Sequence, residues 1–379
     1  MAKSSSARFE GEGLEGIVVA RSELCRIDGE QGELRYRGFD IHDLAEHATF
    51  EEVVHLLFQG KLPKGGELAE TRRRLAGMRR LPDDLLAALR RLPATANPMD
   101  VLRTGVSLLA FSDPDAGNVT LDAVREKSLR LVAQMGTLVA AWDRIRQGRD
   151  PIPPDPALGH AADFLRMLRG SAAPDVDVRA LDCALVLHAE HDLNASTFSA
   201  RVTIATLTDV YSAIAAAVGT LKGPLHGGAN EGVMRALHEI GTVDRVRAWV
   251  DAQFAAKKKV MGFGHRVYRV EDPRARHLRQ MSKAMGERRG DTRLYEMSIA
   301  LEAAVKAAKG LAPNVDFYSA TVYHALGIPL DLFTPIFAVS RIAGWCAHLQ
   351  EQLAANRIIR PLSEYVGHPD LPWIPIDKR

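Results

Sequence analysis

The chain has 379 residues, of which 46% are hydrophobic and 25% are charged. This composition is typical of globular proteins and excludes collagen-like, mainly disordered and disulfide-scaffold classes. Lysine and arginine number 49 against 47 for aspartate and glutamate, which gives a formal net charge of +2. Because no overall positive field results, nucleic acid is not an expected partner, and any anion must be bound by locally placed cations. Aromatic residues are only 6% of the chain, which favours packing between helices.

The expected location is the cytoplasm, away from any membrane. The cysteines Cys25, Cys183 and Cys346 are odd in number and far apart, as is typical of reduced, buried thiols. No uninterrupted apolar run approaches the ~18 residues needed to span a bilayer. The first residues, MAKSSSARFEGEG, contain no apolar segment that would indicate export.

The first predicted element is a small hairpin within residues 25–38, where Asp28 and Gly29 form a turn signal and residues 34–36 form one strand. Beyond it the pattern is helical. Residues 49–52 resemble a capping box, and Gly60 ends the helix that follows. Further helices are predicted over residues 67–78, 84–92, 100–111, 121–147, 177–193, 196–206, 210–221, 230–240, 243–258, 272–287, 292–308, 316–326 and 333–355. More than a dozen helices and almost no strand predict an all-α fold.

Four polar segments interrupt this helical pattern and carry most of the candidate functional residues. They are residues 187–194 (LHAEHDLN), 223–230 (GPLHGGAN), 261–268 (MGFGHRVY) and 313–319 (PNVDFYS). All four are predicted at helix ends, where backbone hydrogen-bond donors are free.

His188 and His191 are spaced so that one helix face would present both, and with a third ligand they could hold a metal ion. Since no cysteine cluster or second histidine pair accompanies them, one core and one surface histidine is the simpler interpretation. His191 also suits a hydrogen-bond donor to a substrate. A metal-dependent hydrolase and a non-catalytic helical scaffold therefore remain alternatives.

His226 precedes two glycines and the start of a predicted helix. The positive end of a helix dipole disfavours the imidazolium ion, which leaves a neutral N–H donor suited to a carbonyl that becomes an enolate. An ordinary loop position fits equally well. The nearby residues 262–264 (GFG) follow no strand and Val267 breaks the dinucleotide-binding pattern, while the lysines at 257–259 either face solvent or bind phosphates.

Asp316 follows a Pro–Asn turn, where it serves either as a helix N-cap or as a general base whose apolar surroundings raise its pKa. Arg274, Arg341 and Arg360 are candidates for binding carboxylates through paired hydrogen bonds. Arg341 lies in an otherwise apolar helix, and a buried arginine is rare without an anion.

Five segments in one order, LHAEHDLNAST, GPLHGGANE, GFGHRVYRVEDPRA, PNVDFYS and FTPIFAVSRIAGW, resemble the citrate synthase family. The likeness extends from about Leu14 to the closing IIRP and IPIDKR, and is nearest to the shorter dimeric type of bacteria and archaea. It implies an all-α fold with a large domain, residues 1–226 and 328–379, which carries the dimer interface and the oxaloacetate site. A small, mobile, CoA-binding domain, residues 227–327, would close over the cleft.

The resemblance also implies roles for individual residues. His226 would bind the thioester oxygen of acetyl-CoA, Asp316 would remove the methyl proton, and His265 would protonate the carbonyl oxygen of oxaloacetate. Oxaloacetate would be bound by His191, Arg274, Arg341 and Arg360, the last reaching the neighbouring subunit of a homodimer. The CoA loop would comprise Lys259, Val260, Met261, Gly262 and Phe263.

The implied reaction condenses acetyl-CoA with oxaloacetate and water to give citrate and CoA, with no metal or other cofactor. The 2-methylcitrate synthases, which use propionyl-CoA, share the same motifs and remain the alternative. His188 and Tyr318 look more like the citrate branch, whereas residues 98–105 (PMDVLRTG) look more like the methylcitrate branch.

Overall fold

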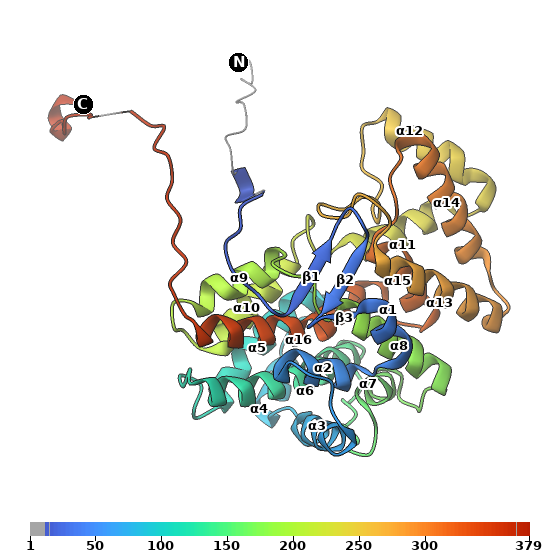
Figure 1. Ribbon diagram of the computed structural model, residues 1–379, viewed down its shortest axis with the longest axis horizontal. Coiled ribbons are helices and arrows are strands. Elements are labelled where there is room, and N and C mark those ends of the chain that lie inside the picture. The colour runs from blue at the N-terminus through green and yellow to red at the C-terminus, as the bar shows by residue number, and fades with distance from the viewer. Residues whose placement is uncertain (1–11, 15, 369) are drawn as a thin grey trace.

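The computed structural model describes residues 12–14, 16–368 and 370–379. Within these residues the chain forms sixteen α-helices and one small three-stranded sheet, so the predicted all-α fold is confirmed. Figure 1 shows the helices in two groups, with α11–α15 gathered at the upper right of the view.

The larger group contains the N-terminal helices and the last long helix. Its members are α1 (Ile41–His47), α2 (Phe50–Gln59), α3 (Gly65–Met78), α4 (Asp83–Leu89), α5 (Pro98–Leu109), α6 (Leu121–Arg146), α7 (His160–Arg169), α8 (Asp175–His188), α9 (Ala195–Ile204), α10 (Val210–Leu221) and α16 (Phe333–Ala354). The smaller group contains α11 (Ala229–Ile240), α12 (Val246–Ala255), α13 (Pro273–Arg289), α14 (Arg293–Lys309) and α15 (Val315–Ala325). The division of the chain into a large and a small domain, and the closure of one over the other, stay predictions.

The predicted hairpin is present and gains a third strand. Strands β1 (Cys25–Asp28), β2 (Glu33–Tyr36) and β3 (Phe39–Asp40) pair in antiparallel order. The β1–β2 turn reaches the smaller group, because Arg269 donates its backbone N–H to the Gly29 carbonyl at 2.9 Å. A Cβ atom at Gly29 would lie only 2.2 Å from the Val267 carbonyl oxygen, so this contact requires glycine.

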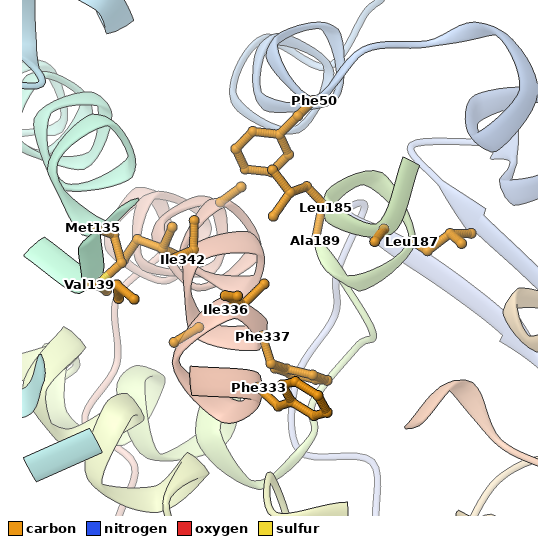
Figure 2. Packing of buried hydrophobic residues seen from close by; sticks show 14 of the residues in the cluster. Phe50, Met135, Val139, Leu185, Leu187, Ala189, Phe333, Ile336, Phe337 and Ile342 are labelled. Carbon is orange, nitrogen blue, oxygen red and sulfur yellow. The ribbon is translucent and has the colours of Figure 1, made fainter. Parts of the chain in front are cut away.

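Helix α16 is the centre of the hydrophobic core and packs against α6, α8 and α9. Figure 2 shows Met135 and Val139 of α6 on one side of α16, and Leu185 of α8 on the other. Residues Leu330–Ala354 are by length and composition alone sufficient to cross a membrane, although Arg341 interrupts their apolar run. Their most apolar window is completely buried inside the molecule, and we therefore assign this helix to the core.

Several helix ends differ from the prediction, and two of these differences affect candidate site residues. Helix α8 ends at His188, so His191 lies outside it and the two histidines do not share a helix face. Asn314 is the N-cap of α15 and its side chain accepts the backbone N–H of Asp316, which excludes the N-cap role for Asp316 itself. The capping box between Thr49 and Glu52 is confirmed. Two helices, α1 and α7, fall outside the predicted ranges.

Candidate active site

A cavity of about 760 Å³ brings most of the predicted site residues together. It is lined by the segment between α8 and α9, the loop before α11, the loop before α13, the start of α15 and the middle of α16. The predicted residues that line it are His191, His226, Met261, His265, Arg274, Asp316 and Arg341. Residues from five separated sequence segments therefore meet in one cleft.

The first turn of α9 fixes the protonation of His226. The backbone N–H of Ser196 donates to His226 Nε2 at 3.3 Å, so this nitrogen carries a lone pair and the proton lies on Nδ1. Ser196 is itself held by Trp345, whose indole N–H donates to the serine Oγ at 3.1 Å. Burial, with Arg341 nearby, lowers the pKa of His226 to about 4. The imidazole is therefore neutral and offers an N–H donor.

His265 is neutral for a similar reason but has the opposite tautomer. Its Nδ1 accepts the backbone N–H groups of Val267 at 3.0 Å and Tyr268 at 3.2 Å, which leaves the proton on Nε2. Burial lowers the pKa of His265 to about 4, and the positive charge of Arg274 acts in the same direction. The His265 ring lies against His191, with ring centroids 5.1 Å apart.

The segment that carries His191 is held by groups that satisfy the last carbonyls of α8. Arg341 Nε donates to the His188 carbonyl at 2.6 Å, and the Gly344 N–H donates to the Ala189 carbonyl at 3.1 Å. A Cβ atom at Gly344 would lie 2.2 Å from Glu190 Oε2, so only glycine permits this approach. The open helix end thereby packs directly on α16.

Asp316 is attached to the predicted CoA loop. Asn314, which caps α15, donates its backbone N–H to the Gly262 carbonyl at 2.9 Å and its side-chain amide to the Gly264 carbonyl at 3.0 Å. Gly262 has a φ of +83°, and a Cβ there would lie 2.6 Å from Val233 and 2.9 Å from Phe317. The loop and the start of α15 therefore form one unit.

The environment of Asp316 makes its carboxyl group a weak acid for an aspartate. Burial raises its pKa to about 7. The positive charge of Arg274 opposes this shift, Asp272 adds to it, and Arg341 opposes it. A carboxyl group with a pKa near neutrality has the property expected of a general base.

The two arginines of the cleft differ in how their charge is balanced. Arg274 forms a bidentate pair with Asp272, with contacts of 2.9 and 2.7 Å, and both side chains are buried. Arg341 is only 2% exposed, yet no carboxylate among the described residues lies within 4.0 Å of it. Its guanidinium carbon lies 4.7 Å from the centroid of the Phe337 ring. The charge of Glu190 acts on Arg341 without forming an ion pair with it. A buried cation without a direct ion pair is costly, which makes Arg341 the strongest candidate for a substrate carboxylate.

Not every predicted residue lines the cavity. Among the CoA-loop residues only Met261 lines the cavity. Lys259 is exposed, Val260 and Gly262 are buried away from the cavity, and Phe263 is partly buried. Arg360 is exposed on the tail after α16, outside the cavity of its own chain. The helix-face geometry behind the metal-hydrolase alternative is wrong, because His191 lies beyond the end of α8.

Sequence analysis missed three residues that organise the site: Ser196, Tyr268 and Asp272. Tyr268 places its hydroxyl 3.2 Å from His191 Nε2. All three lie within the segments that carry the family resemblance, but their spacing gives no sign of their contacts. Only the Asp272–Pro–Arg274 sequence contained a signal, since an N-cap aspartate two residues before an arginine can pair with it.

Neutral histidine donors, buried arginines and a carboxyl group with a pKa near neutrality line one cleft of an all-α fold, an arrangement suited to a condensing enzyme. The chain belongs to the citrate synthase family, because the model described as "Citrate synthase, C-terminal domain" matches residues 13–362. It is 50% identical to the citrate synthase of Haloferax volcanii and 48% identical to citrate synthase 2 of Bacillus subtilis, covering 97% of this chain and 98% of each relative.

Two further comparisons bear on the substrates. The chain is 43% identical to the 2-methylcitrate synthase of Mycobacterium tuberculosis, over 94% of this chain and 90% of the relative. The citrate synthase of Thermoplasma acidophilum, solved as a ternary complex with carboxymethyl coenzyme A and oxaloacetate, superposes with a TM-score of 0.92. That comparison has 33% sequence identity and covers 98% of this chain and 100% of the other.

Proposed function

We propose that this protein is a citrate synthase that condenses acetyl-CoA with oxaloacetate and water, giving citrate and CoA. The observation that carries the proposal is the convergence of His226, His265 and Asp316 on one cleft, each in the protonation state that the reaction needs. The oxaloacetate and CoA-analogue complex of the Thermoplasma acidophilum relative supports the choice of substrates.

In the proposed mechanism Asp316 removes a proton from the acetyl methyl group, and His226 donates its Nδ1–H to the thioester oxygen. Since the imidazole is already neutral, the developing enolate receives a hydrogen bond from a preorganised donor. The enolate carbon then attacks the ketone of oxaloacetate, whose oxygen takes the Nε2 proton of His265. The proton that Asp316 removed from the methyl group then replaces it, so that neither residue changes its protonation state overall. Water finally hydrolyses the citryl thioester. These steps require no metal or redox cofactor.

Oxaloacetate is proposed to lie against His191, Arg274 and Arg341. Arg341 is assigned to one carboxylate because it is buried and forms no ion pair within the described residues, although the charge of Glu190 acts on it. Lys259, Val260, Met261, Gly262 and Phe263 are assigned to the CoA nucleotide. Residues 227–327 would close over both substrates and exclude water during condensation.

A homodimer with composite sites is part of this proposal, with Arg360 reaching the oxaloacetate of the partner. Figure 1 shows the tail that carries Arg360 running away from the body of its own chain. Leu362 and Val366 on this tail are each 87% exposed, which suits a segment that packs on a second copy. The proposed location is the cytoplasm.

The alternative substrate is propionyl-CoA, favoured by the 43% identity to a 2-methylcitrate synthase. Acetyl-CoA and propionyl-CoA differ by one methylene group, which a binding pocket discriminates by only ~1–3 kcal/mol. One pocket can therefore accept both, and the two rates have to be compared. The deciding experiment measures kcat/KM for acetyl-CoA and propionyl-CoA at saturating oxaloacetate. A ratio above one for acetyl-CoA supports citrate synthase, and the reverse ratio assigns the chain to 2-methylcitrate synthesis.

A further inference from the structure

Three buried polar atoms near Asp316 have no hydrogen-bond partner among the described residues. They are Asp316 Oδ1, the Tyr323 hydroxyl and His188 Nε2. An unpaired buried polar group lowers the stability of the folded protein, and such groups are rare in native structures. Their presence together behind a proposed catalytic carboxylate points to a function.

Asp316 and Tyr323 lie on the same helix, seven residues apart in α15 and hence two turns apart on one face. Because helical side chains lean toward the helix N-terminus, the Tyr323 ring extends in the direction of Asp316. The carboxylate is near enough that its charge adds to burial in raising the Tyr323 pKa. His188 approaches from α8, with its ring centroid 6.2 Å from that of Tyr323.

The donors and acceptors of this cluster are complementary. His188 Nδ1 lies 2.7 Å from the Ala184 carbonyl, which only accepts, so the proton of His188 is on Nδ1. Burial lowers the His188 pKa to about 3, and Nε2 therefore keeps its lone pair. The Tyr323 hydroxyl has one proton to donate, and His188 Nε2 and Asp316 Oδ1 are acceptors that have no donor among the described residues, although neither is hydrogen-bonded to the hydroxyl in this structure.

The two oxygens of Asp316 face different surroundings. Oδ1 is buried, whereas the residue as a whole is half-buried and lines the cavity, which leaves Oδ2 for the substrate. The charged groups that influence the Asp316 pKa are Asp272 and Arg274 beside α13 and Arg341 of α16. Other titratable groups of the elements packed on α15 contact different α15 residues, namely His238 of α11 at His324 and Glu302 of α14 at Tyr318.

We propose that Tyr323 is a positioning residue whose side chain shifts when the substrates occupy the cleft. Its hydroxyl, unpaired in the free protein, then donates to Asp316 Oδ1 while Asp316 is a carboxylate, and to His188 Nε2 once Asp316 is protonated. The methyl proton passes to Oδ2, and Tyr323 and His188 neither gain nor lose a proton. Oδ1 loses its negative charge in that step and becomes the weaker of the two acceptors. The inference rests on the proposed role of Asp316 as base.

Opposite pH shifts test this exchange of partners. The measurement is incorporation of solvent deuterium into the acetyl-CoA methyl group, with a non-condensing dicarboxylate in place of oxaloacetate. Tyr323→Phe removes a donor that stabilises the carboxylate, so the midpoint of the acid limb of the exchange rate rises by about one pH unit. Below that midpoint the exchange rate falls about tenfold. The plateau at high pH stays within about threefold, and the binding of the dicarboxylate is unchanged.

His188→Asn removes the alternative acceptor, since the asparagine amide can still reach the Ala184 carbonyl but nothing replaces Nε2. The protonated form of Asp316 is then disfavoured, and the midpoint falls. In a Tyr323→Phe background the same substitution has no further effect, because the hydroxyl through which His188 acts is gone. Two independent structural defects would instead add.

Two controls complete the experiment. Tyr211→Phe removes another buried tyrosine hydroxyl, one that donates to Asp113 at 2.7 Å, and should leave the pH profile unchanged. Thermal unfolding should show Tyr323→Phe at least as stable as wild type, since it deletes an unpaired hydroxyl, whereas Tyr211→Phe should be less stable.

An unmoved acid limb in Tyr323→Phe, or a His188→Asn shift that persists in the Tyr323→Phe background, overturns the inference. Asp316→Asn in the same assay separates this result from failure of the proposed function. If Asp316→Asn abolishes exchange while Tyr323→Phe behaves as wild type, the base role stands and only the Tyr323 role is lost. If Asp316→Asn retains exchange, both are lost.

Discussion

Ser196 donates its backbone N–H to His226 Nε2 at 3.3 Å, and its Oγ lies 2.8 Å from the same atom. The donor comes from the first turn of α9, although His226 itself belongs to the loop before α11. Burial keeps the imidazole neutral, and a helix other than the one expected from the sequence fixes its tautomer, with the single N–H on Nδ1.

We predict that His226→Ala lowers kcat at least roughly tenfold to hundredfold, the size expected for loss of one positioned donor to an enolate. Steady-state kinetics with both substrates saturating measures the effect. His238→Ala, on the exposed side of α11, serves as the matched control and should keep wild-type kcat. An unchanged kcat in His226→Ala would reduce this histidine to a loop residue.

Asp316→Asn should abolish exchange of the acetyl methyl proton while both substrates still bind. In the wild type, the exchange rate should rise with pH through about 7 and then level off, because burial raises the Asp316 pKa to about 7 and only the carboxylate accepts a proton. The measurement is deuterium incorporation as a function of pH, together with calorimetric binding. Exchange at the wild-type rate in Asp316→Asn removes this residue from the base role.

Arg341→Met should weaken oxaloacetate binding roughly tenfold to hundredfold, because a charge-assisted hydrogen-bond pair to a carboxylate is lost. The free protein should also lose some stability, because the buried His188 carbonyl loses the Nε–H donor, although the substitution removes a buried cation as well. KM values for both substrates and thermal unfolding test this. Equal effects on oxaloacetate and acetyl-CoA would contradict the assignment.

Asp182 provides a stability prediction away from the cleft. Its carboxyl accepts the Phe50 N–H at 3.0 Å, and burial, reinforced by Glu51, raises its pKa to about 7. The folded state thus keeps a proton that the unfolded state releases above about 4, and stability falls as pH rises between these values. Asp182→Asn removes this loss, with a slope of up to about 1.4 kcal/mol per pH unit.

Urea unfolding at pH 5 and at pH 8 tests the Asp182 prediction. The stability of Asp182→Asn relative to wild type should be greater at pH 8 than at pH 5. Asp43→Asn, at an exposed acidic position in the first turn of α1, is the control and should show no such difference. A pH-independent difference for Asp182→Asn would show that the carboxyl group titrates normally.

Arg360 tests whether the sites are composite. Arg360→Lys should weaken oxaloacetate far more than acetyl-CoA, because lysine cannot reproduce two parallel hydrogen bonds to a carboxylate. Mixing Arg360→Ala subunits with Asp316→Asn subunits should partly restore activity, since one cleft of the heterodimer then carries both lesions and the other carries neither. No recovery under subunit exchange would place Arg360 outside the partner's site.

Local patterns predicted what depends on neighbouring residues in the sequence. The capping box at Thr49, the hairpin turn at Asp28 and most helices are of this kind. Helix α8 stops earlier than its apolar pattern indicates, because Asp192 adopts a left-handed φ of +51° and α16 satisfies the carbonyls that a longer helix would have used. That stop depends on tertiary contacts.

The site divides in the same way. The residue types at His226 and Asp316 suggested carbonyl recognition and proton removal, and the family resemblance supplied the role of His265. Their tautomers and shifted pKa values depend on burial and on partners far away in sequence, such as Ser196 for His226. The unpaired state of Arg341 is also a property of the packed molecule, which its apolar helix only hinted at.

The hydrogen bonds from Asn314 to Gly262 and Gly264 join the predicted nucleotide loop to the helix that bears the base. Contacts with the adenine end of CoA would thus change the position of Asp316, which would act at the acyl end of the same substrate. If an acyl group were bound without its nucleotide, the loop would not be held, and Asp316 would not be positioned to remove the proton. Binding of the CoA nucleotide would then be required before Asp316 could remove the methyl proton. One short loop would thereby prevent deprotonation that does not lead to condensation.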